Sequence, residues 1–226
     1  MSQGGLNRRF DAVLFDLDGT LIDSAPDLAG AANDLRREHG LPELPYAALR
    51  PMVGSGARGM VGAAFGVAPG EPQFEALRDR FLARYAERLL QETAVFPQVE
   101  LLLQALEAQR WPWGIVTNKA ERFAQPVVAG LALHLRAAVL IGGDTTPHAK
   151  PHPAPLLEAA RRLRVDPARC VYVGDDHRDV VAGRAAGMAT VAAAWGYLGA
   201  GEPIEAWGAD LIVAAPAALL NWLEVT

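Results

Sequence analysis

The stretch FDLDGTLIDS places Asp16, Asp18 and Asp23 directly after the apolar run AVLF. Carboxylates this close repel one another, so at least one of them should have a raised pKa unless a cation lies among them. An Asp-Gly pair is also common in turns, and Asp18-Gly19 could be no more than that. The alternative is a site for a metal ion and a phosphate, and the rest of the chain decides between the two.

Polar residues also follow three later apolar runs. These segments are GIVTNK with Thr117, Asn118 and Lys119, IGGDTTPHAKP with Lys150, and VYVGDDHRD with Asp175, Asp176 and Asp179. If the runs are parallel strands, their carboxyl ends lie at one edge of a sheet and the polar side chains converge there. Carboxylates suit a hard cation such as Mg²⁺. A lysine and a threonine suit phosphoryl oxygens, whereas no His/Cys cluster supports zinc.

Six short apolar runs predict the strands that position these residues. They cover 12–15, 113–118, 138–144, 170–176, 189–194 and 210–214. Fully apolar runs of this length suit strands buried on both faces, as in a parallel sheet. Helical patterns at 98–110, 153–164, 177–187 and 215–223 separate or follow most of them. The alternation predicts an α/β fold with a Rossmann-like parallel sheet and right-handed crossovers.

Residues 24–93 interrupt this alternation and contain no convincing strand. Two amphipathic helices are expected there, over APDLAGAANDLRREHG, which stops at Gly40, and over FEALRDRFLARYAERLL. The stretch VGSGARGMVGAAFG between them is interpreted as a loop. We therefore predict an α/β core of residues 1–23 and 94–226 and an all-helical cap of residues 24–93. An insert at this edge of the sheet could cover the site as a lid.

Composition limits the classes of function. The chain has 226 residues with a net charge of −5, so it offers no basic footprint for nucleic acid and does not favour an anionic membrane surface. No apolar stretch is long enough to span a membrane, and MSQGGLNRRF is not followed by the apolar region of a signal peptide. Cys170 is the only cysteine, so no intramolecular disulfide can form, and we expect it to be buried. We expect a cytoplasmic monomer or homodimer with a small-molecule partner.

The four polar segments, in this order, resemble the motifs of the haloacid dehalogenase superfamily. The pattern is DxDGT, an apolar strand ending in Thr-Asn, Lys-Pro, and GDxxxD. The motifs span most of the chain, and the helical insert is similar to the small cap of the phosphoglycolate phosphatase branch. The resemblance implies a Mg²⁺-dependent phosphatase that works through an aspartyl-phosphate intermediate. Asp18 favours phosphoester hydrolysis, since the dehalogenases lack an acid at this place and the transport ATPases have threonine there.

The resemblance also implies roles for the matching residues. Asp16 is the nucleophile, and Asp18 is the general acid and base. Thr117 and Lys150 hold the phosphoryl oxygens. The Mg²⁺ ligands are Asp16, the backbone carbonyl of Asp18, and Asp175. A cation and Lys150 among the acids would explain why the acids tolerate one another.

Further residues near the motifs have more than one interpretation. Asp179 should support the metal site or the lysine, and Thr20 and Asn118 are assigned to substrate binding. For Asp176 and Asp23, capping of a helix stays open beside a role in the site. Three histidines lie near the motifs, but exposed loop histidines are the commoner case; they are His148, His152 and His177.

Arg58 lies in GSGARGM, a glycine-rich stretch that can bend toward the core. Its guanidinium could bind a substrate carboxylate through two hydrogen bonds, or it could lie on the solvated surface. Resemblance to the phosphoglycolate phosphatases suggests 2-phosphoglycolate as the substrate. Stretches such as GARGMVGAAFG and WGADLIV are similar to the N-acetylmuramic acid 6-phosphate phosphatases of cell-wall recycling, whose substrate also carries a carboxylate.

Two other functions remain as alternative interpretations of the motifs. One is a β-phosphoglucomutase-like mutase. The other is a non-enzymatic switch of the receiver type, in which an aspartate is phosphorylated to change binding. A receiver domain is expected to have neither a DxD pair nor a helical insert after its first strand, and this chain has both.

Overall fold

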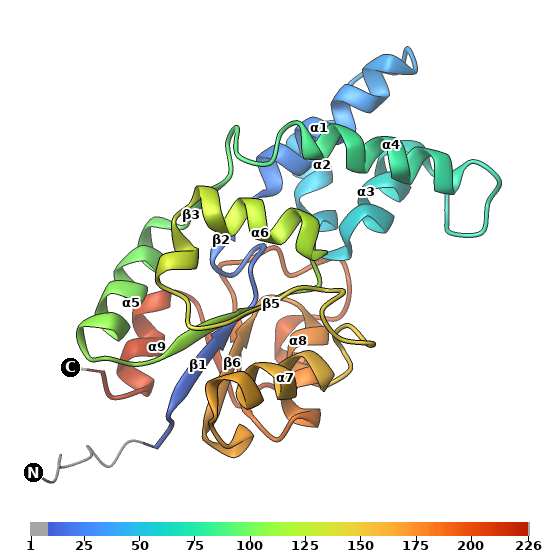
Figure 1. The fold of residues 1–226 in the computed structure, drawn as a ribbon. Helices are drawn as coiled ribbons and strands as arrows, with labels where there is room; N and C mark the ends of the chain where they lie inside the picture. Colours follow the sequence, from blue (N-terminus) through green and yellow to red (C-terminus); the bar gives the residue numbers. More distant parts are fainter. Residues whose placement is uncertain (1–8, 226) are drawn as a thin grey trace, which may run out of the picture.

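In the computed structural model, which describes residues 9–225, six parallel strands form one sheet in the order β5-β4-β1-β6-β7-β8 (Figure 1). The strands are β1 (Ala12–Phe15), β4 (Trp113–Val116), β5 (Leu140–Ile141), β6 (Cys170–Gly174), β7 (Ala189–Ala193) and β8 (Leu211–Val213). The predicted α/β fold with a parallel sheet is confirmed. Residues 1–8, which carry most of the segment used for the signal-peptide prediction, lie outside the described residues.

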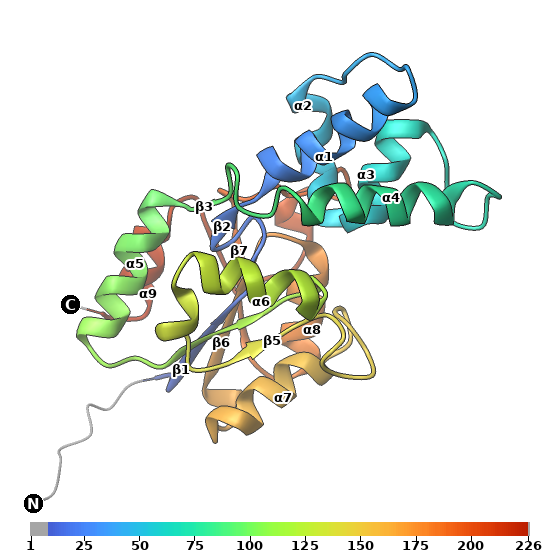
Figure 2. The ribbon, with the colours of Figure 1, turned by 45° about the horizontal axis from the view of Figure 1, so that its top comes forward.

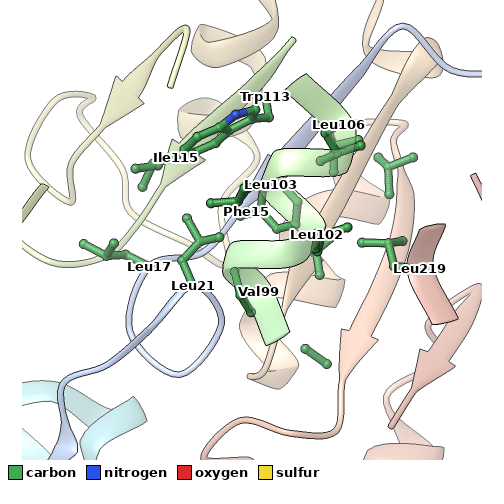
Figure 3. Packing of buried hydrophobic residues seen from close by; sticks show 14 of the residues in the cluster. Phe15, Leu17, Leu21, Val99, Leu102, Leu103, Leu106, Trp113, Ile115 and Leu219 are labelled. Atoms are coloured by element: carbon green, nitrogen blue, oxygen red, sulfur yellow. The ribbon is translucent and has the colours of Figure 1, made fainter. Parts of the chain in front are cut away.

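Helices cover both faces of the sheet. On one face lie α5 (Pro97–Ala108), α6 (Glu121–Gly130) and α9 (Pro216–Trp222), and on the other lie α7 (Ala154–Leu163) and α8 (His177–Ala185). Strand β1 shows why a fully apolar sequence is needed here. Val13 and Phe15 pack in the first layer and Ala12 and Leu14 in the second. Figure 3 shows Leu102, Leu103 and Leu106 of α5 gathered over Phe15 and Trp113.

The register of the sheet brings the polar segments together. Phe15 pairs with Ile115 of β4 and with Val173 of β6. The residues that follow these strands, Asp16, Thr117 and Asp175, therefore leave the sheet at the same edge. This edge faces the helical insert (Figures 1 and 2).

The insert between the first and second strands of the core is helical. It contains α1 (Ala25–Glu38), α2 (Tyr46–Leu49), the 3₁₀ helix η1 (Arg50–Ser55), α3 (Gly56–Phe65) and α4 (Phe74–Ala86). These helices share a buried apolar cluster of their own, which also includes Phe123 and Tyr197 from outside the insert. A short antiparallel pair, β2 (Ile22–Asp23) with β3 (Ala94–Val95), lies where the chain enters and leaves the insert. The predicted domain boundaries stay predictions, and this pair coincides with them.

The interpretation of VGSGARGMVGAAFG as a loop is wrong. The helices η1 and α3 run through it, and α3 buries Met60, Val61 and Ala64. The spacing i, i+1, i+4 places these three residues on one helix face, and their burial stabilises the helix in spite of its glycines. Glycine lowers helix propensity but does not prevent a helix whose apolar face is buried.

Helix α6 was not among the predicted helices. Pro126 lies inside it, and a proline removes one backbone hydrogen bond and argues against a helix. The helix forms nevertheless because Phe123, Ala124, Val127 and Val128 are all buried. This omission affects the site, because α6 begins just after the polar residues that follow β4.

Three predicted strands extend two or more residues beyond the ends of the observed ones. The predicted ranges 113–118, 138–144 and 170–176 contain β4, β5 and β6, each of which ends two or more residues earlier. The residues beyond the strand ends turn away from the sheet and form the site. No helix in residues 9–225 is long and apolar enough to cross a membrane. Cys170 is buried as predicted, and burial raises the pKa of its thiol to about 11.

Candidate active site

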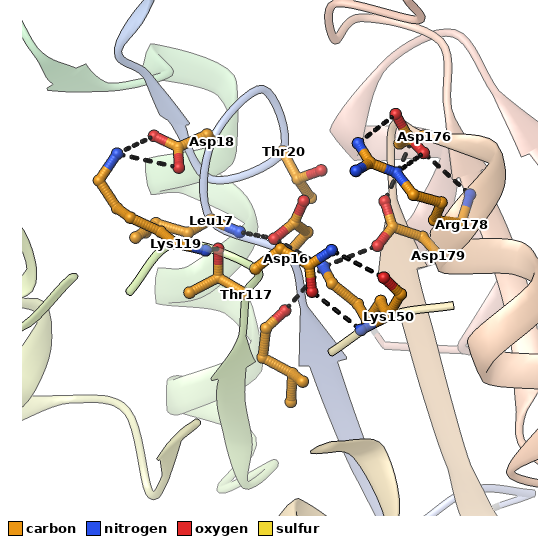
Figure 4. Close-up of polar contacts among 12 residues, drawn as sticks. Asp16, Leu17, Asp18, Thr20, Thr117, Lys119, Lys150, Asp176, Arg178 and Asp179 are labelled. Atoms are coloured by element: carbon orange, nitrogen blue, oxygen red, sulfur yellow. Dashed lines mark hydrogen bonds and ion pairs between the residues drawn. The ribbon is translucent and has the colours of Figure 1, made fainter. Parts of the chain in front are cut away.

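A cavity of about 320 Å³ lies between the carboxyl edge of the sheet and the helical insert. Its lining includes seven of the nine residues predicted to form the site: Asp16, Asp18, Thr117, Asn118, Lys150, Asp175 and Asp179. They come from four segments that are far apart in the chain. Figure 4 shows Asp16, Thr117 and Lys150 around one space, with Asp18 beside it.

Asp16 is the centre of an acidic cluster. Its carboxylate oxygens and those of Asp175 and Asp179 provide one ligand atom each, and these atoms lie within 4.8 Å of one another. Asp16 Oδ1 accepts a hydrogen bond of 2.7 Å from the backbone N–H of Leu17 and lies 2.9 Å from Lys150 Nζ. Burial raises the pKa of Asp16 to about 6, with Lys150 lowering it and Asp179 raising it. Among the acids that follow β1, Asp16 therefore has the raised pKa expected from the sequence, and burial is its largest cause.

Lys150 supplies the positive charge inside this cluster. Its side chain is 3% exposed, and Nζ lies 2.9 Å from Asp16 and 2.8 Å from Asp179. Nζ also donates to the hydroxyl of Tyr172 at 2.8 Å and to the carbonyl of Val116 at 3.1 Å. Burial alone would lower the pKa of Lys150, but the charges of Asp16 and Asp179 outweigh it and raise the pKa. Lys150 is thus a fixed ammonium ion.

Asn118 and Thr20 hold other site residues in place. The side-chain amide of Asn118 donates to the carbonyl of Lys150 and accepts from its N–H, both at 2.9 Å. Thr20 is fully buried and its hydroxyl donates to Asp175 Oδ1 at 2.9 Å. Asn118 lines the cavity, whereas Thr20 does not. These contacts favour positioning roles over the substrate binding predicted for both residues.

Asp175 is held by the loop after β7 as well as by Thr20. Its Oδ2 accepts a hydrogen bond of 2.7 Å from the backbone N–H of Tyr197. Gly19, which has a φ of +80°, packs so closely against Asp175 that a Cβ at this position would overlap the carboxylate. Burial raises the pKa of Asp175 well above its usual range, and Asp16 and Asp179 raise it further.

The three carboxylates fit a hard divalent cation such as Mg²⁺, which prefers oxygen ligands. Asp179 has little capacity left, because Oδ1 accepts from Lys150 and Tyr172 and Oδ2 accepts from the N–H of Asp176. Asp16 and Asp175 have more lone pairs available and are the better candidates for direct ligands. A cation there would also offset the burial and repulsion that raise the pKa of both acids. A ligand role for the carbonyl of Asp18 stays a prediction.

Asp18 has a different cationic partner from Asp16. Lys119 Nζ donates to both carboxylate oxygens of Asp18, at 2.9 and 3.1 Å, and the hydroxyl of Ser24 donates to Oδ1 at 2.5 Å. Figure 4 shows the Asp18 carboxylate turned toward Lys119 and away from Lys150. Lys119 also lies 4.7 Å from the ring centre of Tyr85 in α4. No role for Lys119 was predicted from the sequence, although this lysine directly follows the Thr-Asn motif.

Asp176 and Arg178 connect the core to the insert. Asp176 caps α8, with Oδ1 accepting from the N–H of Arg178 at 2.9 Å, and it binds the Arg178 guanidinium at 2.7 Å. The same guanidinium donates to the carbonyl of Gly54 in η1. The helix-capping interpretation of Asp176 is therefore supported. Arg178 was not predicted, because its contact partner lies 124 residues away.

Asp23 caps the start of the insert. Its Oδ1 accepts from the N–H of Ala25 at 3.2 Å and from the hydroxyl of Tyr197 at 2.9 Å. Asp23 is not among the residues that line the cavity. The three histidines considered from the sequence, His148, His152 and His177, are exposed and do not line it either.

The structure does not bring Arg58 to the cavity. Arg58 is exposed on α3, although residues 53–57, just before it, line the cavity. The part of the stretch that carries Arg58 is helical and buries Met60 and Val61, which supports the alternative interpretation of Arg58 as a surface residue. The arginines that do line the cavity are Arg122 and Arg178.

Replacing Lys150 with methionine should destabilise the metal-free protein. The change removes the ammonium ion from between buried Asp16 and Asp179, and breaking a buried ion pair in this way costs about 3–5 kcal/mol. Urea unfolding in the presence of a chelator measures the loss. Adding Asp179→Asn to Lys150→Met should recover part of it, because one uncompensated charge is then removed. Unfolding of Lys150→Met at the wild-type urea concentration would contradict this account of Lys150.

Comparison with known proteins extends over nearly the whole chain. Residues 13–193 match the family of haloacid dehalogenase-like hydrolases. A phosphoglycolate phosphatase of Xanthomonas campestris pv. campestris is 51% identical over 206 residues, which cover 91% of this chain and 92% of that protein. An N-acetylmuramic acid 6-phosphate phosphatase of Pseudomonas aeruginosa is 42% identical over 216 residues, which cover 96% of each chain.

A solved structure is also similar to this chain over nearly its whole length. The crystal structure of a predicted phosphoglycolate phosphatase from Haemophilus somnus has a TM-score of 0.84 and 29% sequence identity to this chain. The similarity covers 96% of this chain and 99% of that one. It therefore includes the helical insert as well as the sheet.

Proposed function

Because the chain belongs to the haloacid dehalogenase-like hydrolases, as its four motifs indicated, we propose that it is a Mg²⁺-dependent phosphatase of a small carboxylate-bearing phosphomonoester. One observation carries the proposal: Asp16, Asp18, Thr117 and Lys150, from three separate segments, line a single cavity. The named relatives support it, since those at 51% and 42% identity are phosphatases of 2-phosphoglycolate and of N-acetylmuramic acid 6-phosphate.

In this proposal Asp16 attacks the substrate. Its Oδ1 is held by Leu17 and Lys150, and its Oδ2 accepts no hydrogen bond from residues 9–225. An oxygen of Asp16 forms a bond to phosphorus, the bond from phosphorus to the leaving oxygen breaks, and an aspartyl phosphate results. Lys150 and Thr117 bind the phosphoryl oxygens. Mg²⁺ held by Asp16 and Asp175 would supply further positive charge to these oxygens.

Asp18 transfers the protons of both steps. Its carboxyl group first protonates the leaving oxygen, and its carboxylate then takes a proton from the water that attacks phosphorus and releases Asp16. Lys119 and Ser24 hold the Asp18 carboxylate away from the Asp16–Lys150 pair. Two acids in different environments are what a nucleophile and an acid–base group require.

Replacing Asp18 with asparagine should separate proton transfer from metal binding. The amide cannot exchange protons in this way, so kcat should fall by roughly 10²–10⁴-fold. Binding of Mg²⁺ should change less than in Asp175→Ala, because the Asp18 side chain lies on Lys119 and outside the acidic cluster. Isothermal titration calorimetry with Mg²⁺ on the two metal-free variants measures their affinity for the ion. An equal loss of Mg²⁺ binding in the two variants would contradict the division of roles.

Release of phosphate from p-nitrophenyl phosphate in the presence of Mg²⁺ tests the proposal most directly. A phosphatase turns over many times and liberates inorganic phosphate. A mutase passes its phosphoryl group to a phosphosugar, which this assay does not contain, and a phospho-aspartate switch would take up at most one phosphoryl group per chain, so neither would sustain turnover. Failure of the purified protein to turn over this ester would reject the proposed function.

With 2-phosphoglycolate as the first candidate substrate, N-acetylmuramic acid 6-phosphate is the second. It is favoured by the 42% identity to the Pseudomonas aeruginosa phosphatase. It is also favoured by the cavity, whose lining includes the aromatic rings of Phe81, Tyr85 and Phe123. A cavity of about 320 Å³ is within the usual range for small-molecule sites.

A further inference from the structure

We infer that Arg122, in the first turn of α6, binds the carboxylate of the substrate, and that Tyr85 and the apolar side chains around it receive the rest of the non-reacting part. This inference rests on the proposed phosphatase function and narrows its substrate class. The class is a phosphomonoester that joins a carboxylate to a body with apolar faces, such as a substituted sugar ring.

The charges of the cavity point to Arg122. Four cationic side chains line it, and three have a carboxylate partner: Lys119 with Asp18, Lys150 with Asp16, and Arg178 with Asp176. Arg122 has no ion pair with any residue in the part of the chain that the structure describes. Since Lys150 already serves the phosphoryl end, Arg122 is the cation available to a second anionic group of the ligand.

The backbone that carries Arg122 is anchored at the start of α6, and the Arg122 side chain itself is exposed. Asp144 accepts a hydrogen bond of 2.8 Å from the N–H of Glu121 and so anchors the start of α6. The Arg122 guanidinium lies 4.7 Å from the ring centre of Phe123, and the Glu121 side chain is directed to Thr145 and Gln125. A guanidinium kept from its neighbouring carboxylate can bind a substrate carboxylate through two parallel hydrogen bonds.

Tyr85 is a second and independent indication of a ligand. Its side chain comes from α4, lines the same cavity and is 2% exposed. Its hydroxyl lies close to the Lys119 ammonium, which can only donate, and no residue among 9–225 accepts the hydroxyl proton. Burial raises its pKa to about 12, so the group keeps its proton at neutral pH. A buried hydroxyl whose proton has no acceptor is costly, and an acceptor on the substrate would remove that cost.

The rest of the lining indicates the size of the ligand body. Around Tyr85 the cavity is lined by Leu28, Phe81, Leu82 and Phe123, and the rings of Tyr85 and Phe123 are 5.7 Å apart. In 2-phosphoglycolate a single methylene separates the phosphate from the carboxylate, so it offers almost no apolar surface to these side chains. The ring and methyl groups of an N-acetylated sugar acid would cover them.

A matched pair of substrates tests the role of Arg122. N-acetylmuramic acid 6-phosphate and N-acetylglucosamine 6-phosphate share the sugar ring and the acetamido group, and only the first has a lactyl ether, which carries the carboxylate. For Arg122→Gln we expect kcat/KM to fall about 10- to 150-fold on the first, mainly through KM, as for a lost charge-assisted hydrogen bond. On N-acetylglucosamine 6-phosphate, kcat/KM of Arg122→Gln should change less than about 3-fold. Arg122→Lys should recover part of the activity on N-acetylmuramic acid 6-phosphate that Arg122→Gln loses.

Tyr85→Phe separates ligand binding from folding. Because no described residue accepts the hydroxyl proton, its removal should leave the melting temperature nearly unchanged or raise it. The value of kcat/KM should nevertheless fall about 2- to 10-fold on both sugar phosphates, as for one neutral hydrogen bond. This loss should exceed any change in kcat/KM on p-nitrophenyl phosphate, which has no sugar group to accept the Tyr85 proton.

The outcomes distinguish this inference from the proposed function. Equal losses on the two sugar phosphates in Arg122→Gln, or no loss on either, would overturn it. A loss of kcat/KM in Arg58→Gln that is confined to the carboxylate-bearing substrate would also overturn the inference. A higher kcat/KM of the wild type on 2-phosphoglycolate than on N-acetylmuramic acid 6-phosphate would overturn it as well. If one of these contrary outcomes is found while all variants still hydrolyse p-nitrophenyl phosphate, only the inference fails. If the wild type does not hydrolyse it, the proposed function fails first.

Discussion

Replacing Asp16 with asparagine is expected to lower kcat by at least about 10⁴-fold while the protein stays folded. The asparagine side chain has the same shape, and its oxygen can still accept from Leu17 and Lys150. It lacks the charge that makes the aspartate a nucleophile. The raised pKa of Asp16 indicates that this charge is unfavourable in the folded protein, so removing it should not destabilise the fold strongly.

Steady-state phosphate release and thermal unfolding, measured on the same preparations, check this result. Asp166→Asn is a matched control, because Asp166 caps a short 3₁₀ helix away from the cavity and undergoes the same chemical change. The control should keep near wild-type kcat. Substantial turnover by purified Asp16→Asn would show that another group attacks phosphorus.

The core of the site could be predicted from the sequence because parallel strands impose it. Once 12–15, 113–118 and 170–176 are strands of one parallel sheet, the residues after them must meet at one edge. The register, with Phe15 between Ile115 and Val173, then fixes Asp16, Thr117 and Asp175 as neighbours. The convergence of these three residues needs no knowledge of side-chain packing.

The outer part of the site could not be predicted in this way. The position of Arg122 depends on where α6 begins, and Pro126 concealed that helix. Tyr85 and Arg178 meet the cavity only because α4 and η1 dock on the core, which is tertiary packing. Arg58 was considered for substrate binding because glycine-rich stretches often form loops, but burial of Met60 and Val61 makes this one a helix.

The pairing of acids with lysines was also beyond the sequence. Asp16 and Asp18 are two residues apart, and Lys119 and Lys150 are both near the same edge of the sheet. The short turn after β1 directs Asp16 inward to Lys150 and Asp18 outward to Lys119 and Ser24. The pattern of residues specifies that acids and lysines meet, and the backbone of the turn specifies which acid meets which lysine.

Removing divalent metal is expected to abolish turnover, and Mg²⁺ is expected to restore it. With Asp16, Asp175 and Asp179 together and Lys150 as their shared cation, a phosphate dianion would meet net negative charge at the cluster. Dialysis against EDTA followed by titration with MgCl₂ measures the effect on initial rate. Full activity after thorough chelation would contradict a metal requirement and would leave Lys150 and Thr117 as the groups that bind phosphate.

Binding of Mg²⁺ should be visible without any substrate. A ligand that binds only the folded state raises the melting temperature, by an amount that grows with its concentration. Asp175→Asn should lose most of this shift, whereas Asp18→Asn should keep most of it, because the Asp18 carboxylate lies on Lys119. The affinity should also fall between pH 7.5 and 5.5, since the pKa of Asp16 is raised to about 6 and a protonated carboxyl is a poor ligand. A pH-independent shift, or an equal shift in Asp175→Asn, would place the metal away from the acidic cluster.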